Sequence, residues 1–226
     1  MRYIISLGGS VICPSLINRG FLKRFRRFIL KRVKKGERFL IIVGGGRIAR
    51  YYQITARKEG VKNSKDLDWL GIYTTWLNAY FLKSLFKRYS QKELIVDPLN
   101  DKLDLRKRII VGGGWKPGWS TDYVCVLLAK RLKVKMIINL SDITFIYNKD
   151  PKQFKSAKPF KRLSWSAYKK IAVKLWKPGL NSPFDSKATN LAQKLNLRVV
   201  FLKGDDLKNF KLFLDGNNFK GTVIED

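Results

Sequence analysis

Three clusters of glycine, each directly after a short apolar run, could do chemistry in this sequence of 226 residues. They are Gly8-Gly9, Gly44-Gly45-Gly46 and Gly112-Gly113-Gly114. A glycine loop between a strand and a helix exposes backbone N–H groups that no Cβ obstructs, and such amides bind phosphates. One such loop often only turns the chain, whereas three at one sheet edge indicate ligands with several phosphates. None has the spacing of a Walker P-loop or of a Rossmann dinucleotide-binding loop.

The absence of histidine limits the chemistry further. It excludes mechanisms that need an imidazole base, Ser-His and Cys-His pairs, and histidine metal sites. Phosphoryl transfer needs none of these, because its catalysis is mostly positioning and electrostatic stabilisation. Lysine, arginine, backbone amides and Mg²⁺ are sufficient for that reaction.

The composition is strongly basic, with 47 Lys and Arg against 17 Asp and Glu and a net charge of +30. Such a charge attracts nucleic acid, membrane surfaces or small phosphates. We favour the simpler interpretation, lysines spread over a solvated surface, and regard nucleic acid as an unlikely partner. No apolar run reaches the about 18–20 residues of a membrane span, and Cys13 and Cys125 are expected to be buried thiols. We therefore expect a cytoplasmic protein that contacts no membrane.

Apolar, strand-like runs alternate with helical segments along the chain, which predicts one α/β domain over residues 1–226 with a mainly parallel sheet. The glycine loops should then open on one edge of that sheet. The expected strands are 3–7, 39–43, 93–97, 108–111 and the runs KMIINL, LRVVFLKG and GTVIED. The expected helices are 21–35, 47–58, 67–89, the segment after Ser120-Thr121-Asp122, the segment SPFDSKATNLAQKLN with Ser182 or Asp185 as its cap, and KNFKLFLDG.

The ordered motifs resemble those of the amino acid kinase superfamily, with the greatest similarity to its archaeal-type uridylate kinases. The resemblance runs from residue 3 to 224 and is carried by ISLGGS, VGGGRIAR, GGGWKPGWSTD, IYNKDP and KGTVIED. It implies an αβα sandwich with a mainly parallel central sheet and a homohexameric assembly. It also implies transfer of the ATP γ-phosphoryl to UMP, giving UDP for pyrimidine nucleotide biosynthesis. Mg²⁺ would accompany ATP, and we expect no metal site formed by the protein alone.

The resemblance assigns the ATP side of the site to the first two glycine loops and to the segment around IYNKDP. Arg50 matches an arginine that contacts phosphate oxygens, although it could instead be a surface charge on its helix. Tyr147 would flank the nucleotide, unless it is a plain strand aromatic. The expected ATP-binding residues are Gly8, Gly9, Ser10, Gly46, Arg50, Ser141, Tyr147 and Asp150.

The UMP side is assigned to the second and third loops and to the helix between them. Asp68 matches the acid that holds the ribose hydroxyls, and Asp66 would replace it if the register slips by two. Thr75 and Asn78 match a pair that lines the acceptor side, or are ordinary helix polar residues. Trp115 and Trp119 either cover the site or pack against the rest of the protein. The expected UMP-binding residues are Gly45, Asp68, Trp115, Lys116, Pro117, Gly118, Trp119, Ser120 and Thr121.

The sequence departs from the family at Ser6, where most members carry a lysine that neutralises the transferred phosphoryl group. We hypothesise that Lys116 replaces this cation, the alternative being an ordinary surface lysine. The expected catalytic set is therefore Lys116, Arg50 and Asp122, with Asp122 orienting a lysine or the metal. A second departure lies on the ATP side, where the family's usual residues are replaced by Asp142, Thr144 and Phe145.

Several related functions remain as alternatives. Isopentenyl phosphate kinases carry a histidine where this chain has Arg47, and Ser120-Thr121-Asp122 fits a nucleotide acceptor better than a carboxylate acceptor. A kinase for another small phosphate or carboxylate acceptor is one alternative. A catalytically weakened member that binds nucleotides or RNA is another, motivated by Ser6 and the net charge of +30.

Overall fold

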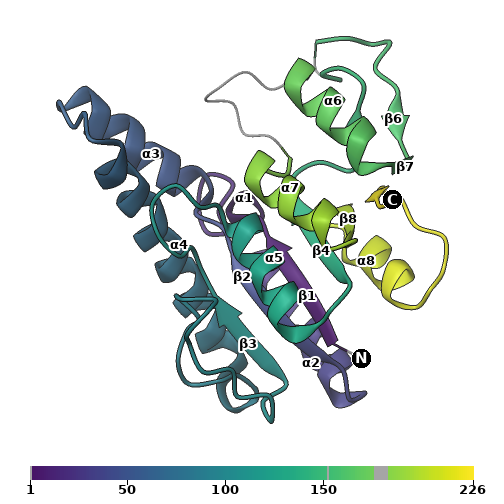
Figure 1. The fold of residues 1–226 in the computed structure, drawn as a ribbon. Helices are drawn as coiled ribbons and strands as arrows, with labels where there is room; N and C mark the ends of the chain where they lie inside the picture. The colour runs from purple at the N-terminus through teal and green to yellow at the C-terminus, as the bar shows by residue number, and fades with distance from the viewer. Residues whose placement is uncertain (1, 152, 176–182) are drawn as a thin grey trace.

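The computed structural model describes residues 2–151, 153–175 and 183–226 of the chain. In the main sheet the strand order is β3-β2-β1-β4-β8-β9-β7 (Figure 1). The first five of these strands are parallel, and only β9 and β7 run the other way. The strands are β1 (Arg2–Leu7), β2 (Arg38–Val43), β3 (Ile109–Gly112), β4 (Met136–Ser141), β7 (Arg162–Leu163), β8 (Arg198–Lys203) and β9 (Thr222–Ile224), and β5 (Ile146–Tyr147) pairs with β6 (Pro159–Phe160) as a separate ribbon.

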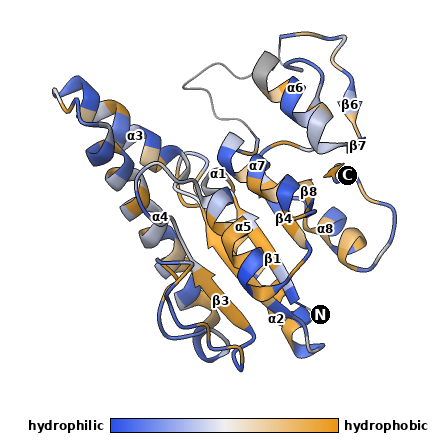
Figure 2. Cartoon of the chain, in the orientation of Figure 1, coloured by the Kyte–Doolittle hydropathy of each residue, from blue (hydrophilic) through white to orange (hydrophobic). Residues whose placement is uncertain are grey.

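Helices cover both faces of this sheet, so the expected αβα sandwich is confirmed (Figure 1). Alternate residues of β1 enter the two cores: Ile5 packs with α2, α4 and α8, whereas Ile4 packs with α5, α6 and α7. Figure 2 shows the apolar central strands between helices that are hydrophilic on the outside. The helices are α1 (Gly9–Ile12), α2 (Arg19–Lys34), α3 (Gly46–Lys58), α4 (Ser64–Phe86), the 3₁₀ turn η1 (Lys87–Tyr89), α5 (Thr121–Leu132), α6 (Trp165–Leu175), α7 (Ser186–Lys194) and α8 (Leu207–Leu214).

The predicted N-cap of α7 and the predicted burial of the two cysteines are confirmed. Asp185 is the N-cap of α7, where its carboxylate accepts hydrogen bonds from two backbone amides; the alternative cap, Ser182, lies outside the described residues. Cys13 and Cys125 are both buried and free. None of the helices in the described part of the chain is long and apolar enough to cross a membrane.

The strand expected at 93–97 is wrong. The carboxylate of Asp101 accepts hydrogen bonds of 2.8 Å from the backbone amides of Val96 and Asp97, which closes a turn there. Only an isolated bridge between Ile95 and Gly112 remains of the expected strand. The helix α6 and the β5–β6 ribbon were not expected from the sequence.

Candidate active site

The three glycine loops follow β1, β2 and β3, which are parallel neighbours, so all three lie at the carboxyl edge of the sheet as expected. The first two loops touch through their backbones. A Cβ on Gly9 would lie 2.3 Å from the amide nitrogen of Gly46 and 2.4 Å from the carbonyl oxygen of Gly44. Gly46 itself has a φ of +69°, which side chains rarely adopt. These glycines are therefore required to bring the first two glycine loops into contact.

Polar side chains tie the second loop to its surroundings. The guanidinium of Arg50 on α3 donates a hydrogen bond of 3.1 Å to the hydroxyl of Ser10 in the first loop. The amide of Asn78 on α4 donates to the carbonyl oxygens of Gly44 and Gly45, at 3.0 and 3.2 Å. Asn78 thus turns the loop carbonyls toward α4, which leaves the loop amides for an anion.

Thr75 and Trp76 of α4 hold the third loop. The buried hydroxyl of Thr75 accepts a 2.7 Å hydrogen bond from the amide of Gly114 and donates to the helix carbonyl of Ile72. The indole N–H of Trp76 donates to the carbonyl of Gly114 at 2.7 Å. Sequence reasoning missed Trp76, because nothing in the sequence indicates which face of α4 meets this loop.

The loop after β3 is also held at Gly118. The carboxylate of Asp68 accepts a hydrogen bond of 2.8 Å from the amide of Gly118, whereas Asp66 is exposed in the first turn of α4. The ammonium group of Lys187 on α7 donates to the carbonyl of Gly118, also at 2.8 Å. The structure therefore brings Asp68, and not Asp66, to the expected acceptor loop.

Aromatic rings and two cations line this loop. The rings of Trp115 and Trp119 lie 6.1 Å apart, and Trp119 lies 4.2 Å from the ring of Tyr123. The exposed ammonium of Lys116 sits 3.9 Å above Trp115, and that of Lys187 sits 4.5 Å above Trp119. Sequence reasoning missed Lys187, since 69 residues separate it from the Gly118 carbonyl that it binds.

Ser6 and Asp122 meet between β1 and α5. The hydroxyl of Ser6 donates a 2.9 Å hydrogen bond to the Asp122 carboxylate, which also accepts one of 3.3 Å from Asn139. Burial of the carboxyl, together with the negative charge of Asp185, raises the pKa of Asp122 to about 7. A neutral hydroxyl therefore occupies the place beside Asp122 where the resemblance implies a lysine.

Ser120 and Thr121 begin α5. The hydroxyl of Ser120 caps the helix by accepting a hydrogen bond from the amide of Tyr123, and it donates to Asp185. Pro117 and Thr121 are both half-buried in the same loop-to-helix segment. The structure thus gives Ser120 a structural role in addition to the expected substrate contact.

The expected ATP-side residues divide into two groups. Ser141 ends β4 next to Gly8, and its buried hydroxyl has no hydrogen-bond partner among the described residues. Tyr147 lies on β5 and Asp150 in the connection from β5 to β6. This ribbon is joined to β9 of the main sheet by a 2.9 Å hydrogen bond from the amide of Ile146 to the hydroxyl of Thr222, and the ring of Phe145 meets that of Tyr147 edge to face.

Gly204 was missed, although its place directly after β8 is the same signal as in the other loops. Its amide donates a hydrogen bond of 2.7 Å to the carbonyl of Ser141. A Cβ there would meet Val11, in the helix that follows the first glycine loop, at 2.8 Å. The close approach of backbone and side chains at this edge therefore extends from β3 to β8.

A bound Mg²⁺ would have to rely on few protein ligands. No group of three or more Cys, Asp or Glu residues that could hold a metal ion occurs among the residues that the structure describes. Magnesium in phosphotransferases is commonly held by substrate phosphates, waters and one or two carboxylates. Asp122, which accepts a hydrogen bond from Ser6 near the end of β1, is one carboxylate at this edge, so the residues present fit an ion delivered with ATP.

The fold and this edge define an α/β protein built to bind phosphorylated ligands. Residues 1–203 match the model of the amino acid kinase family. The chain belongs to that family.

Relatives and solved structures agree with this assignment. A uridylate kinase of Thermoplasma acidophilum is 34% identical over 226 residues, which cover 99% of this chain and 96% of the relative. A uridylate kinase of Methanocaldococcus jannaschii is 31% identical over 230 residues and covers both chains fully. The crystal structure of uridylate kinase from Archaeoglobus fulgidus is similar with a TM-score of 0.83 and 30% identity, over 99% of this chain and 100% of that chain.

Proposed function

We propose that this protein is a UMP kinase, which transfers the γ-phosphoryl group of ATP to UMP and forms UDP and ADP. The observation that supports the proposal is the shared edge, where Gly9 of the first glycine loop lies against the backbone of Gly46 in the second, so that ligands of the two loops would be adjacent. Full-length relatives named uridylate kinase support the same activity. A catalytically weakened binding module is not favoured by these matches.

The chain's own residues bind and orient the two nucleotides. The loop amides around Gly8, Gly9 and Gly46 would bind the ATP phosphates, and Arg50 would stabilise negative charge on the oxygens of the transferred group. Asp68 would accept hydrogen bonds from the UMP ribose hydroxyls. Positioning the two phosphates in line is the main contribution of such a site, because little proton transfer is required.

This chain has Ser6 at the position where most family members carry a lysine, so another cation must neutralise the transferred phosphoryl group. Two cations lie at the acceptor loop. We assign that neutralising role to Lys116, whose ammonium projects from the loop above Trp115. Lys187 is a positioning residue, because it holds the carbonyl of Gly118. Mg²⁺ would bind with the ATP phosphates and Asp122, and it would supply charge neutralisation when bound.

Assembly and location belong to the same proposal. Tyr73, Leu77 and Tyr80 on α4 are 60%, 67% and 59% exposed. Their spacing places these large side chains along one helix face, which is typical of a contact between copies. We propose that this face contributes to a homohexamer, and that the enzyme works in the cytoplasm in pyrimidine nucleotide biosynthesis.

The proposal is tested by measuring ADP release in a coupled assay with Mg-ATP and a panel of acceptors. The panel contains UMP, CMP, dUMP, AMP, isopentenyl phosphate and N-acetylglutamate. We expect the largest kcat/KM for UMP. A larger value for any non-nucleotide acceptor would contradict the proposal.

A further inference from the structure

The outer face of α2 carries an unusual concentration of positive charge. Eight of the sixteen residues of the helix are basic and none is acidic. Within the described part of the chain, the ion pairs of this helix all run from Arg32, to Glu37 and Asp215. The other basic residues are Arg19, Lys23, Arg24, Arg26, Arg27, Lys31 and Lys34.

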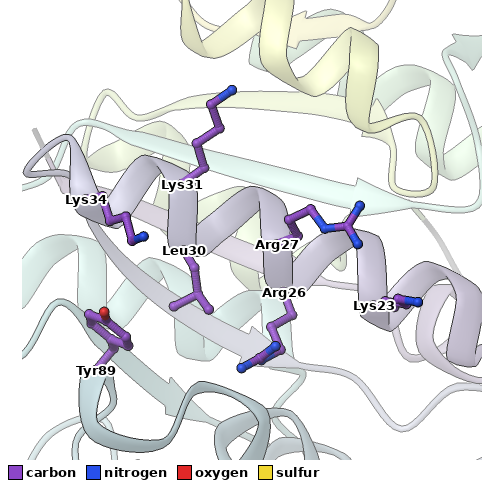
Figure 3. Close-up of a pocket in the computed structure, with 7 residues that line it drawn as sticks. All are labelled: Lys23, Arg26, Arg27, Leu30, Lys31, Lys34 and Tyr89. Carbon is purple, nitrogen blue, oxygen red and sulfur yellow. The ribbon is translucent and has the colours of Figure 1, made fainter.

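Part of this face forms an open groove of about 520 Å³, called here the α2 groove. Figure 3 shows its cationic side chains on both sides of Leu30, with the ring of Tyr89 facing Leu30 and Lys34. Arg26 is held by a 2.7 Å hydrogen bond to the carbonyl of Leu85. The residues that line the groove are Lys23, Arg26, Arg27, Leu30, Lys31, Lys34 and Tyr89.

One end of the groove, at Lys34 and Tyr89, lies on a different part of the molecule from the glycine loops. The last turn of α2 leads directly into β2, and Tyr89 precedes the bridge between Ser90 and Ile109 at the start of β3. Lys34 and Tyr89 therefore lie toward the amino edge of the sheet, whereas the loops occupy the carboxyl edge. A ligand at this end of the α2 groove would lie away from the glycine loops.

The dimensions of the groove favour a polyanion over a single phosphate compound. Lys23 and Lys34 are eleven positions apart, which corresponds to about 16 Å along the helix axis. Phosphates of one strand in a duplex are about 3.4 Å apart along the axis and those of an extended single strand are farther apart, so this distance accommodates a run of a few consecutive phosphates. One mononucleotide would leave most of these cations unpaired.

The chemistry of the groove favours a nucleic acid among polyanions. Tyr89 offers a half-buried aromatic ring beside the cations, with the guanidinium of Arg88 5.3 Å from the ring centre. Aromatic rings next to a positively charged groove are the usual means of holding single-stranded nucleic acid. A membrane fits less well, because the apolar side of α2 is already buried, with Phe21, Phe25 and Ile29 fully inaccessible.

We propose that the α2 groove binds single-stranded nucleic acid, with the cations on its phosphates and Tyr89 against a base. The measurement is fluorescence anisotropy of labelled 20-mers of oligouridylate and oligodeoxythymidylate with the full chain. An excess of UMP and ATP keeps the oligonucleotide out of the nucleotide site. We expect a Kd on the order of 1–10 μM at low salt, and the two oligonucleotides distinguish RNA from DNA.

Two charge-matched variants separate the groove from the charge of the whole protein. Lys23→Glu/Arg27→Glu/Lys31→Glu should raise the Kd at least about 10-fold and reduce the slope of log K against log salt by about 2. The control changes exposed lysines of α5, α6 and α8, as Lys130→Glu/Lys170→Glu/Lys208→Glu, and should change the Kd less than about 2-fold. Both variants should keep the wild-type melting temperature and UMP kinase rate.

Tyr89→Leu tests the aromatic contact while keeping an apolar side chain at the position. It should weaken oligonucleotide binding about 5-fold or more and leave the binding of polyphosphate unchanged. Equal losses in the two triple variants would overturn the proposal in favour of the net charge. No binding by the wild type, or tighter binding of polyglutamate than of either oligonucleotide, would also overturn it.

Discussion

Asp68 on α4 and Lys187 on α7 bind the two backbone groups of the same residue, Gly118. The carboxylate accepts from its amide and the ammonium donates to its carbonyl, each at 2.8 Å. Two helices that are remote in sequence thus fix the loop that we assign to UMP. The loop needs a glycine at position 118, because Gly118 has a φ of +82°, a conformation that other residues rarely adopt.

Replacing Asp68 by Asn should weaken UMP binding. The amide oxygen can still accept from Gly118, but the side chain loses its charge and one of the two acceptors for a ribose diol. We expect KM for UMP to rise about 10-fold or more, with a smaller change in KM for ATP. Asp66→Asn, two residues earlier and exposed, is the matched control. An equal rise of KM in both variants would contradict the assignment.

The two lysines at the acceptor loop should have separable effects. Lys116→Ala should lower kcat about 100-fold, because the proposed cation acts on charge that develops in the transition state. Lys187→Ala should mainly raise KM for UMP, because it frees the Gly118 carbonyl. Lys194→Ala, exposed on the same helix as Lys187, should leave both constants unchanged. A near-normal kcat for Lys116→Ala would refute its catalytic role.

Adding a single methyl group at Gly9 should separate the first two glycine loops. An alanine Cβ would lie within 2.6 Å of three backbone atoms of the second loop. We expect a loss of about 1–3 kcal/mol in the free energy of unfolding and a higher KM for ATP. In the control Gly20→Ala the nearest atoms are side-chain atoms at 3.4 and 3.7 Å. Urea titrations showing equal stability for the two variants would argue against the loop contact.

Thr75 should matter more than its neighbour Thr74. Thr75→Val removes the acceptor of the Gly114 amide, which is then left without that partner at a buried site. The expected cost is about 1–3 kcal/mol, together with weaker UMP binding. Thr74→Val removes only a hydrogen bond to the helix carbonyl of Leu70. Thermal unfolding and UMP titration of both variants measure the difference, and indistinguishable results would contradict the role of Thr75.

The raised pKa of Asp122 makes the stability of the ligand-free protein depend on pH. The folded protein binds this proton more tightly than the unfolded chain does, so protonation of Asp122 stabilises the fold. Its full contribution to the free energy of unfolding is present below about pH 4. It is lost as pH rises toward the folded pKa of about 7. Asp122→Asn keeps the acceptor for Ser6 and cannot ionise. Between pH 5 and 8 the variant should therefore gain about 2–3 kcal/mol relative to the wild type in Mg²⁺-free urea titrations. Parallel pH profiles would show that Asp122 does not titrate in this range.

Much of the fold could be predicted because it rests on local patterns. The apolar runs before Gly8, Gly44 and Gly112 gave three strands, and their alternation with helices gave a parallel sheet with one shared edge. The expected strand at 93–97 failed because a side chain, Asp101, captures the amides that a strand would use. Apolar periodicity does not report such a contact.

Within the site, sequence reasoning identified the loops but not the side chains that hold them. The pairing of Trp76 with Gly114 and of Lys187 with Gly118 depends on how α4 and α7 lie against the third loop. The hydrogen bond from Ser6 to Asp122 could not be predicted either, because the two residues are 116 positions apart in the sequence. Gly204 could have been found, because it follows a strand as the other glycines do.

The central claim is that a phosphoryl group passes from ATP to UMP at this edge. Phosphorus NMR of the wild-type protein with equimolar Mg-ATP and UMP measures it directly, because the substrate and product phosphates have separate signals. We predict that UDP and ADP form together in a one-to-one ratio while ATP and UMP decrease. Unchanged ATP, or release of inorganic phosphate without UDP, would contradict the account.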